Sequence, residues 1–397
     1  MRFGLFSRMV LYSASPPTSA PARHVYVAPR LEGSRLVIDG DLGKAEWQAV
    51  PWSTPFDEIR GVVDAPEGTR PSDACRTRMK MLWDDEFLYI GALLESDVAV
   101  VASFTERNSP IFQKDTDFEV FIDAAGSCHC YKELEINALN VVWNLLLTRP
   151  YSNGGGEHSG RVAQPGAPCY YEVAAQRTAT RLLSGALGDP TGATWSVEIA
   201  LAHSDTLARQ PGVRAPAVGT RWRINFSRVE RCGEINWTWQ PQTVWEPRER
   251  RYVGKVNMHL PDAWGLVEFG AMDTSATGQS QPGAPSPSDA AHAAAFQLYY
   301  AQLMHRDLHG SFAPSVRALS DSGLLVEADL VPCELGIATD AQALAIGAPY
   351  EPEPEASEPQ PEPGTVFVAT AFDPSTGHSV SVRHDRLVVT RAPGSLV

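Results

Sequence analysis

Two short segments joined by one loop carry acidic and amide side chains at alternating positions. In the first segment Asp117 and Glu119 alternate with apolar residues, and in the second Glu135 and Asn137 do the same. Alternation with a period of two is typical of half-buried β-strands. The connecting stretch Ala124–Cys130 contains Gly and Ser, which favours a β-hairpin.

The register of this hairpin decides its chemistry. If Asp123 pairs with Tyr131, Glu119 lies directly opposite Glu135, and like charges across a strand pair destabilise a sheet. The pair therefore needs an arginine, a metal ion, a proton or ligand hydroxyl groups beside it. A solvated acidic sheet face is the alternative, and the residues alone do not decide between the two.

The acidic residues of the two segments are compatible with two further chemistries. Calcium takes about six or more oxygen ligands, and five carboxylates could contribute to such a site, although the sequence has no EF-hand-like loop. The five are Asp117, Glu119, Asp123, Glu133 and Glu135. Paired carboxylates also catalyse glycoside hydrolysis, so a hydrolase acting on O-glycosyl compounds is an alternative function. No cofactor other than Ca²⁺ is indicated here, and no G-x-S-x-G, Walker or Rossmann motif is present.

Composition limits the partners of the chain. With 397 residues, 43% of them hydrophobic and 20% charged, the chain can form a packed core. Its net charge of −14 argues against nucleic acid and anionic membranes as partners. No run of about 18 apolar residues exists, so no membrane span is predicted. The six cysteines lack the usual zinc spacing, which favours reduced thiols.

The chain divides into four parts by composition. Residues 1–24 form a leader, expected to be disordered, in which Arg8 interrupts the apolar stretch that a secretory signal needs. An organelle-targeting segment is the alternative, so the sequence leaves the compartment open. Residues 25–270 carry the strand signals, residues 271–289 form a Ser/Pro/Gly-rich linker, and residues 290–397 form an extension.

Short alternating segments with close turn signals predict an all-β, antiparallel β-sandwich for residues 25–270. Trp83, Trp195 and Trp222 are expected to fill its core. The predicted strands are His24–Arg30, Met79–Trp83, Phe87–Leu94, Val141–Thr148, Thr194–Asp205, Arg221–Glu230, Ile235–Pro241 and Gly265–Phe269.

The extension combines one helix with a few strands. A helix is predicted over Ala290–Asp307, strands over Leu324–Leu330 and Thr365–Ala371, and a hairpin over His378–Thr390. The acidic, Pro-rich insert Tyr350–Gly364 is expected to be disordered. A small α+β module and a partly disordered tail are both compatible with this pattern.

Seven pieces of the chain, taken in order, resemble the family 9 carbohydrate-binding modules of the DOMON-like superfamily. They are LVIDGDLGKAEW, MKMLWDDEFLYIGALLE, DFEVFID, YKELEIN, TWSVEIAL, RWRINFSRVE and MHLPDAWGLVEF. The resemblance covers Val25 to Gly270 and implies an immunoglobulin-like sandwich with a carbohydrate ligand in a cleft on one side. It implies non-catalytic binding with a link to carbohydrate catabolism. Modules of this kind usually accompany a catalytic domain, but the remaining residues are too few and too polar to form one, so the protein either works alone or delivers a catalytic partner protein.

The resemblance also implies a set of ligand-binding residues. Members of the family hold a terminal sugar between two Trp rings and bind its hydroxyls with Glu, Arg and Asn. The motif match assigns the Glu to Glu119 and the Asn to Asn137, while Glu135 stands where the family has Arg. Phe112 takes the place of the first ring and Trp245 that of the second. The acidic Glu135 suits a cation or an amino sugar better than a neutral sugar, because Glu cannot supply the donors of Arg.

Some DOMON-like relatives bind haem through Met or His, which gives a second hypothesis. Met258 and His259 would be the ligands of a haem- or metal-binding domain. The structural interpretation, which we favour, is a turn-stabilising His259 and a gap-filling Met258.

Overall fold

The computed structural model describes most of the chain. The described residues are 21–33, 35–210, 212–231, 233–271, 286–330, 332–339 and 365–395. Most of the predicted leader, most of the linker and the acidic insert lie outside them. Within the described ranges, no helix has the length and apolarity that a membrane crossing requires.

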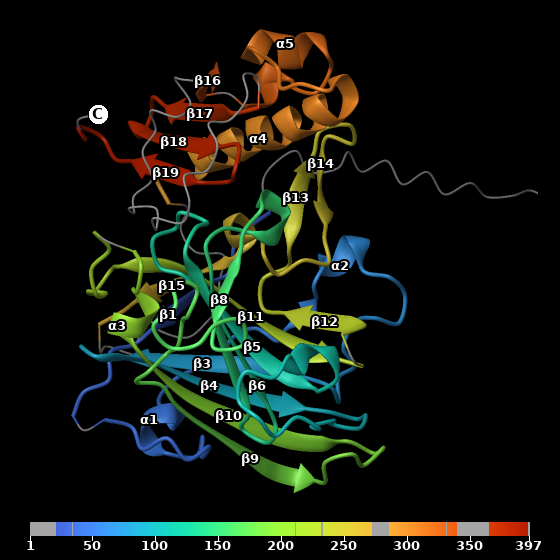
Figure 1. The fold of residues 1–397 in the computed structure, drawn as a ribbon, viewed down its shortest axis with the longest axis vertical. Coiled ribbons are helices and arrows are strands. Elements are labelled where there is room, and N and C mark those ends of the chain that lie inside the picture. The colour runs from blue at the N-terminus through green and yellow to red at the C-terminus, as the bar shows by residue number, and fades with distance from the viewer. Residues whose placement is uncertain are drawn as a thin grey trace, which may run out of the picture.

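Two sheets pack face to face and form a β-sandwich, seen in the lower half of Figure 1. Within the described residues, the larger sheet has the order β1-β15-β11-β5-β6-β7-β8, with β12 attached to β11 and β2 to β12. Its strands are β1 (Val25–Ala28), β2 (Asp57–Glu58), β5 (Asp117–Asp123), β6 (Tyr131–Asn137), β7 (Val142–Leu147), β8 (Glu157–Ser159), β11 (Arg221–Glu230), β12 (Ile235–Thr238) and β15 (Gly265–Phe269). The pair β1–β15 is parallel and the other pairs are antiparallel.

The smaller sheet has the antiparallel order β3-β4-β10-β9 in the part of the chain that is described. Its strands are β3 (Thr77–Trp83), β4 (Phe87–Glu95), β9 (Arg177–Gly185) and β10 (Ala193–Ala202). A separate hairpin pairs β13 (Thr243–Glu246) with β14 (Arg251–Gly254). Short helices lie in the connections: α1 (Ala45–Gln48), α2 (Gly61–Asp64), η1 (Ile111–Gln113), η2 (Tyr151–Asn153), α3 (His203–Thr206) and η3 (Pro261–Ala263).

The main core fills the space between the two sheets. Strand β5 contributes Phe118, Val120 and Ile122 to it, and β6 contributes Leu134 and Ile136. The alternation in the sequence therefore gives the correct inward face for both strands. The predicted core tryptophans belong to the same cluster: Trp83, Trp195 and Trp222.

The C-terminal residues form a small α+β unit above the sandwich in Figure 1. Helix α4 packs against β17 and β18 of an antiparallel sheet with the order β16-β17-β18-β19. The elements are α4 (Asp289–His309), α5 (Val316–Asp321), η5 (Glu327–Leu330), β16 (Glu334–Thr339), β17 (Phe367–Asp373), β18 (His378–Arg383) and β19 (Val388–Arg391). The predicted strand Leu324–Leu330 is wrong. These residues form a turn and η5, because both Leu324 and Leu325 are buried in the core under α4.

The C-terminal unit docks on the loop that joins β5 to β6. Cys128 from this loop is fully buried within the core of the C-terminal unit. The backbone N–H of Val388 donates to the carbonyl of Ser127 at 3.0 Å. A buried ion pair between Arg386 and Asp262, 2.6 Å long, joins the two units at a second point. The two strands that carry the acidic residues thus end against the C-terminal unit.

Candidate functional site

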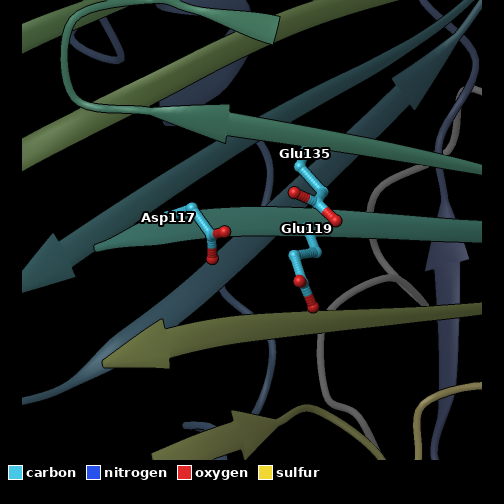
Figure 2. Close-up of side chains that lie close together, drawn as sticks. All are labelled: Asp117, Glu119 and Glu135. Carbon is cyan, nitrogen blue, oxygen red and sulfur yellow. The ribbon is translucent and has the colours of Figure 1, made fainter. Parts of the chain in front are cut away.

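Three carboxylates from β5 and β6 converge on the outer face of the larger sheet. The register pairs Glu119 with Glu135 and Asp117 with Asn137, as the sequence predicts. Figure 2 shows the three acidic side chains on the same side of these neighbouring strands. One oxygen from each of Asp117, Glu119 and Glu135 lies within 4.8 Å of the others.

The acidic face is buried, so the hypothesis of a solvated acidic surface is wrong. Asp117, Glu119, Glu133 and Glu135 are each at most 5% exposed. Burial, the largest cause, raises the pKa of Glu119 to about 7. Burial followed by the charge of Glu119 raises the pKa values of Asp117, Glu133 and Glu135 well above the ordinary range.

A second apolar cluster explains why this outer face is covered. Residues from the larger sheet and from the loops around it pack together beside the carboxylates. The cluster consists of Ile59, Phe121, Tyr131, Trp143, Leu145, Leu147, Met258 and Trp264. Apolar side chains therefore also pack on the outer face of the sheet, and the carboxylates lie in a low-dielectric layer between the strands and the loops.

The buried carboxylates have fewer hydrogen bonds than their oxygen atoms can accept. Asp117 Oδ1 accepts from the backbone N–H of Val229 at 3.2 Å, and Glu135 Oε2 from that of Phe112 at 3.4 Å. Oδ2 of Asp117 and Oε2 of Glu133 have no hydrogen-bond partner among the described residues. Within the described residues, none of the four buried acids on β5 and β6 forms an ion pair with Lys or Arg. Each unpaired buried oxygen costs free energy that a ligand donor would recover.

An exposed ring lies at one end of the acidic cluster. Phe112 is 36% exposed, and it stacks on Trp143 with ring centroids 5.9 Å apart and planes inclined by 19°. Trp143 lies directly opposite Glu135 in the β6–β7 pair, and its indole Nε1 is buried without a described partner. The predicted Phe112, Glu119 and Glu135 thus lie together. Trp143 was not predicted as a site residue. The signal that could have identified it is the alternation of β7, which places Trp143 on the same face of the sheet as Glu135.

A second exposed ring lies near Glu133. Tyr151 of η2 is 46% exposed and contacts the ring of His259 edge-on, with centroids 4.7 Å apart. His259 Nδ1 lies 4.0 Å from Glu133 Oε2. Burial and then the charge of Glu133 raise the pKa of the Tyr151 hydroxyl. Sequence reasoning did not identify this ring, because its only signal is an aromatic residue that follows a strand and precedes a Gly-rich loop.

Asn137 lies beside the cluster, but its amide is fully engaged within the protein. Its Nδ2 donates to the carbonyl of Phe104 at 3.0 Å and to Asp115 Oδ2 at 2.8 Å. Its Oδ1 accepts from the backbone N–H groups of Leu139 and Val141. These four bonds satisfy the side chain, so Asn137 orders the turn after β6 and has no spare group for a ligand.

Trp245 lies in a different place from the acidic residues. It belongs to β13, is 5% exposed and contacts Tyr252 edge-on, with centroids 5.4 Å apart. It lines a small cavity of about 10 Å³ together with Gln297 and Leu325 of the C-terminal unit. In this structure Trp245 is therefore a packing residue of the junction between the units.

Met258 and His259 are held by local packing. Met258 is 6% exposed and belongs to the apolar cluster under the acidic residues. His259 Nδ1 lies within hydrogen-bond distance of the Tyr131 hydroxyl, at 3.0 Å, and burial lowers the pKa of this histidine to about 4. These contacts support the structural interpretation of the pair.

Comparisons with known proteins give a family, and solved structures of similar fold include the following three. The family model described as carbohydrate family 9 binding domain-like matches residues 38–245, just over half of the chain. A candidate carbohydrate-binding protein from Bacteroides uniformis is 13% identical with a TM-score of 0.45, and the match covers 62% of this chain and 99% of that one.

The other two structures are of a carbohydrate binding module family 9 from Caldicellulosiruptor kristjanssonii, both 17% identical with TM-scores of 0.37. The match to the complex with cellotriose covers 66% of this chain and 100% of the module. The match to the complex with glucose covers 62% of this chain and 96% of the module. No curated protein sequence matches the chain.

Proposed function

The chain belongs to the carbohydrate family 9 binding domain-like family, and from that premise we propose that it binds a carbohydrate on the outer face of its larger sheet. The binding site consists of the carboxylates on β5 and β6 and the exposed rings Phe112 and Tyr151. The observation that carries the proposal is the pair of buried oxygens without partners, Asp117 Oδ2 and Glu133 Oε2. The hydroxyl groups of a sugar can donate hydrogen bonds to such oxygens.

The exposed rings supply the apolar half of the recognition. A pyranose ring has an apolar C–H face that stacks on an aromatic side chain, while its rim carries hydroxyl groups. The backbone of Phe112 is hydrogen-bonded to Glu135, so a sugar stacked on this ring lies beside that carboxylate. Tyr151 serves the opposite end of the site, next to His259.

No Lys or Arg of the described residues pairs with these acids, which makes the site suited to amino sugars. An ammonium group on a sugar would supply both a charge and three donors to Glu119 and Glu135. Chitosan trimer is therefore expected to bind more tightly than cellotriose, which has the same linkage pattern without the charge. A role in carbohydrate catabolism beside a catalytic partner is the wider part of this proposal.

Isothermal titration calorimetry with both trisaccharides tests the proposal. Phe112→Ala is expected to weaken binding by about 0.5–1.5 kcal/mol, the value of one aromatic stacking contact. Leu183→Ala is the matched control, because Leu183 is an exposed apolar residue on β9 of the other sheet. No heat with either sugar would reject the proposal, and release of reducing sugar would favour the hydrolase alternative.

A divalent cation is the second candidate, favoured by the convergence of three carboxylate oxygens within 4.8 Å. Ca²⁺ would have oxygen ligands from Asp117, Glu119 and Glu135 and would need water or sugar hydroxyls to complete its coordination. Under this alternative, CaCl₂ raises the melting temperature at pH 8, EDTA reverses the effect, and Glu119→Gln abolishes it. An equal effect of CaCl₂ on Glu119→Gln would remove this candidate.

A further inference from the structure

A basic cavity lies between the sandwich and the C-terminal unit. Its volume is about 140 Å³, and Arg23, Arg221, Arg223 and His292 are among its lining residues. A single water needs roughly 10–15 Å³ on the same measure. The cavity therefore has room for an ion with four oxygen atoms, and its three guanidinium groups contrast with the net charge of −14 of the whole chain.

Arg223 is a buried cation that faces Asp123 across the β11–β5 pair but has no carboxylate in direct contact within the described residues. Its exposed fraction is 9%, and its Nη1 donates to Cys128 Sγ at 3.6 Å. Within the described parts of the chain it forms no ion pair with a carboxylate, whereas the neighbouring Arg221 pairs with Glu268 at 2.8 Å. A buried charge without a partner is costly, so an anion in the cavity would stabilise Arg223.

His292 presents an unsatisfied donor in the same cavity. It is 7% exposed, and its Nδ1 lies 3.2 Å from Nη2 of Arg23. A guanidinium group can only donate, so Nδ1 is the acceptor and Nε2 carries the proton. No described residue accepts a hydrogen bond from Nε2. His292 therefore lines the cavity and carries a buried N–H group without a described partner.

Helix α4 begins at the cavity and adds to its positive potential. The helix is 21 residues long, and the side chain of its N-cap residue Ser288 makes no capping hydrogen bond to the first turn. Ser286, Ser288 and Asp289 also line the cavity. The carboxylate of Asp289 accepts from the backbone N–H of Ser286 at 2.7 Å. Because Arg221 is paired with Glu268, Arg23 and Arg223 are the two lining arginines that form no ion pair within the described residues. Helix N-termini with unsatisfied N–H groups favour anions.

We propose that this cavity binds a small oxyanion, a phosphate or sulfate group, held by Arg23, Arg223 and the Nε2–H of His292. Arg223 belongs to β11 and His292 to α4, so the ion would bridge the sandwich and the C-terminal unit. The site is separate from the proposed sugar site, and each proposal stands without the other.

Thermal melting and calorimetry of the full chain test the site, with sodium phosphate, sodium sulfate and sodium chloride at equal ionic strength as probes. Phosphate or sulfate is expected to raise the melting temperature more than chloride does. Arg223→Gln and Ala125→Glu are both expected to weaken oxyanion binding roughly tenfold or more. Ala125 lines the cavity on an exposed loop, so its replacement by Glu supplies a competing carboxylate without disturbing the core.

The matched control is Ala186→Glu, an exposed alanine just after β9 in the other sheet, which is expected to bind as the parent does. Glucose 6-phosphate distinguishes a free ion from a phosphorylated sugar as the ligand. If the protein binds glucose 6-phosphate more tightly than inorganic phosphate, the ligand is a phosphorylated sugar. Equal melting shifts with chloride and phosphate would overturn the proposal. Unchanged phosphate affinity in Ala125→Glu would overturn it as well.

Discussion

At the scale of single residues, the central feature is a set of buried acids that form no ion pair with Lys or Arg in the described part of the chain. The types and spacing of Glu119 and Glu135 predict the cross-strand pair, and the structure confirms it. The sequence did not predict that loops would cover these acids. Alternation with a period of two separates the two faces of a strand, but it does not show which segments pack on the outer face. Asn137 shows the same limit, since its amide nitrogen is engaged by Phe104 and Asp115, which lie more than 20 positions earlier in the chain.

The buried acids make stability depend on pH in a definite direction. Burial raises the pKa of Glu119 from 4.5 to about 7 in the folded protein. Below pH 4.5 both the folded and the unfolded state hold this proton, and the full stability is present. Between pH 4.5 and 7 the unfolded state releases the proton first, so the free energy of unfolding falls as pH rises. The parent protein is therefore expected to melt at a lower temperature at pH 8 than at pH 5.

Glu119→Gln removes this titration while it keeps the shape of the side chain. It is expected to stabilise the protein at pH 8 by roughly 2–3 kcal/mol and to change little at pH 5. Chemical denaturation at both pH values measures the difference. Glu46→Gln, at an exposed position in α1, is the control. A uniform effect of Glu119→Gln at both pH values would show that the carboxyl does not titrate as described.

At the scale of elements, alternating strands were the most predictable part of the fold. The sequence placed β11 over Arg221–Glu230 and β15 over Gly265–Phe269 with the bounds that the structure has. Strand β9, which spans Arg177–Gly185, was missed because this edge strand is largely exposed and lacks apolar alternation. Trp245 was assigned to the sugar site as the match to the second ring of the family, and a sequence match does not show which neighbour a hairpin packs against.

Trp245→Ala separates the two roles of this residue. Because the indole is 5% exposed and packs between β13 and the C-terminal unit, its removal is expected to cost about 3–5 kcal/mol of stability. Sugar affinity of the folded variant, measured by calorimetry, is expected to stay unchanged. Trp245→Phe keeps most of the contact and should lose less stability. If Trp245→Ala lost sugar affinity without losing stability, Trp245 would be a ligand-binding residue and this description of it would be wrong.

At the scale of the whole molecule, the C-terminal unit is joined to the sandwich by buried polar contacts. Arg386 donates to Asp262 at 2.6 Å and to the Tyr300 hydroxyl at 2.9 Å, and it is 4% exposed. Breaking one partner of a buried ion pair leaves the other charge uncompensated. The sequence predicted a helix and strands in this region, but a contact between residues 124 positions apart has no local signal.

Arg386→Met therefore tests the coupling of the two units. The variant is expected to lose about 3–5 kcal/mol and to melt in two calorimetric transitions instead of one. Arg386→Lys keeps the charge but loses the forked geometry, so an intermediate loss is expected. A single transition at the parent temperature in Arg386→Met would contradict this description of the junction.

The location of sugar binding is tested most directly by hydrogen–deuterium exchange of the full chain with and without saturating trisaccharide. We expect slower exchange in η1, β5 and β6 and around Tyr151 when the sugar is bound, because these segments carry the rings and the carboxylates. The C-terminal unit and the hairpin of β13 and β14 should exchange at the same rate in both samples. Protection confined to that hairpin around Trp245, with none on β5 and β6, would contradict the account.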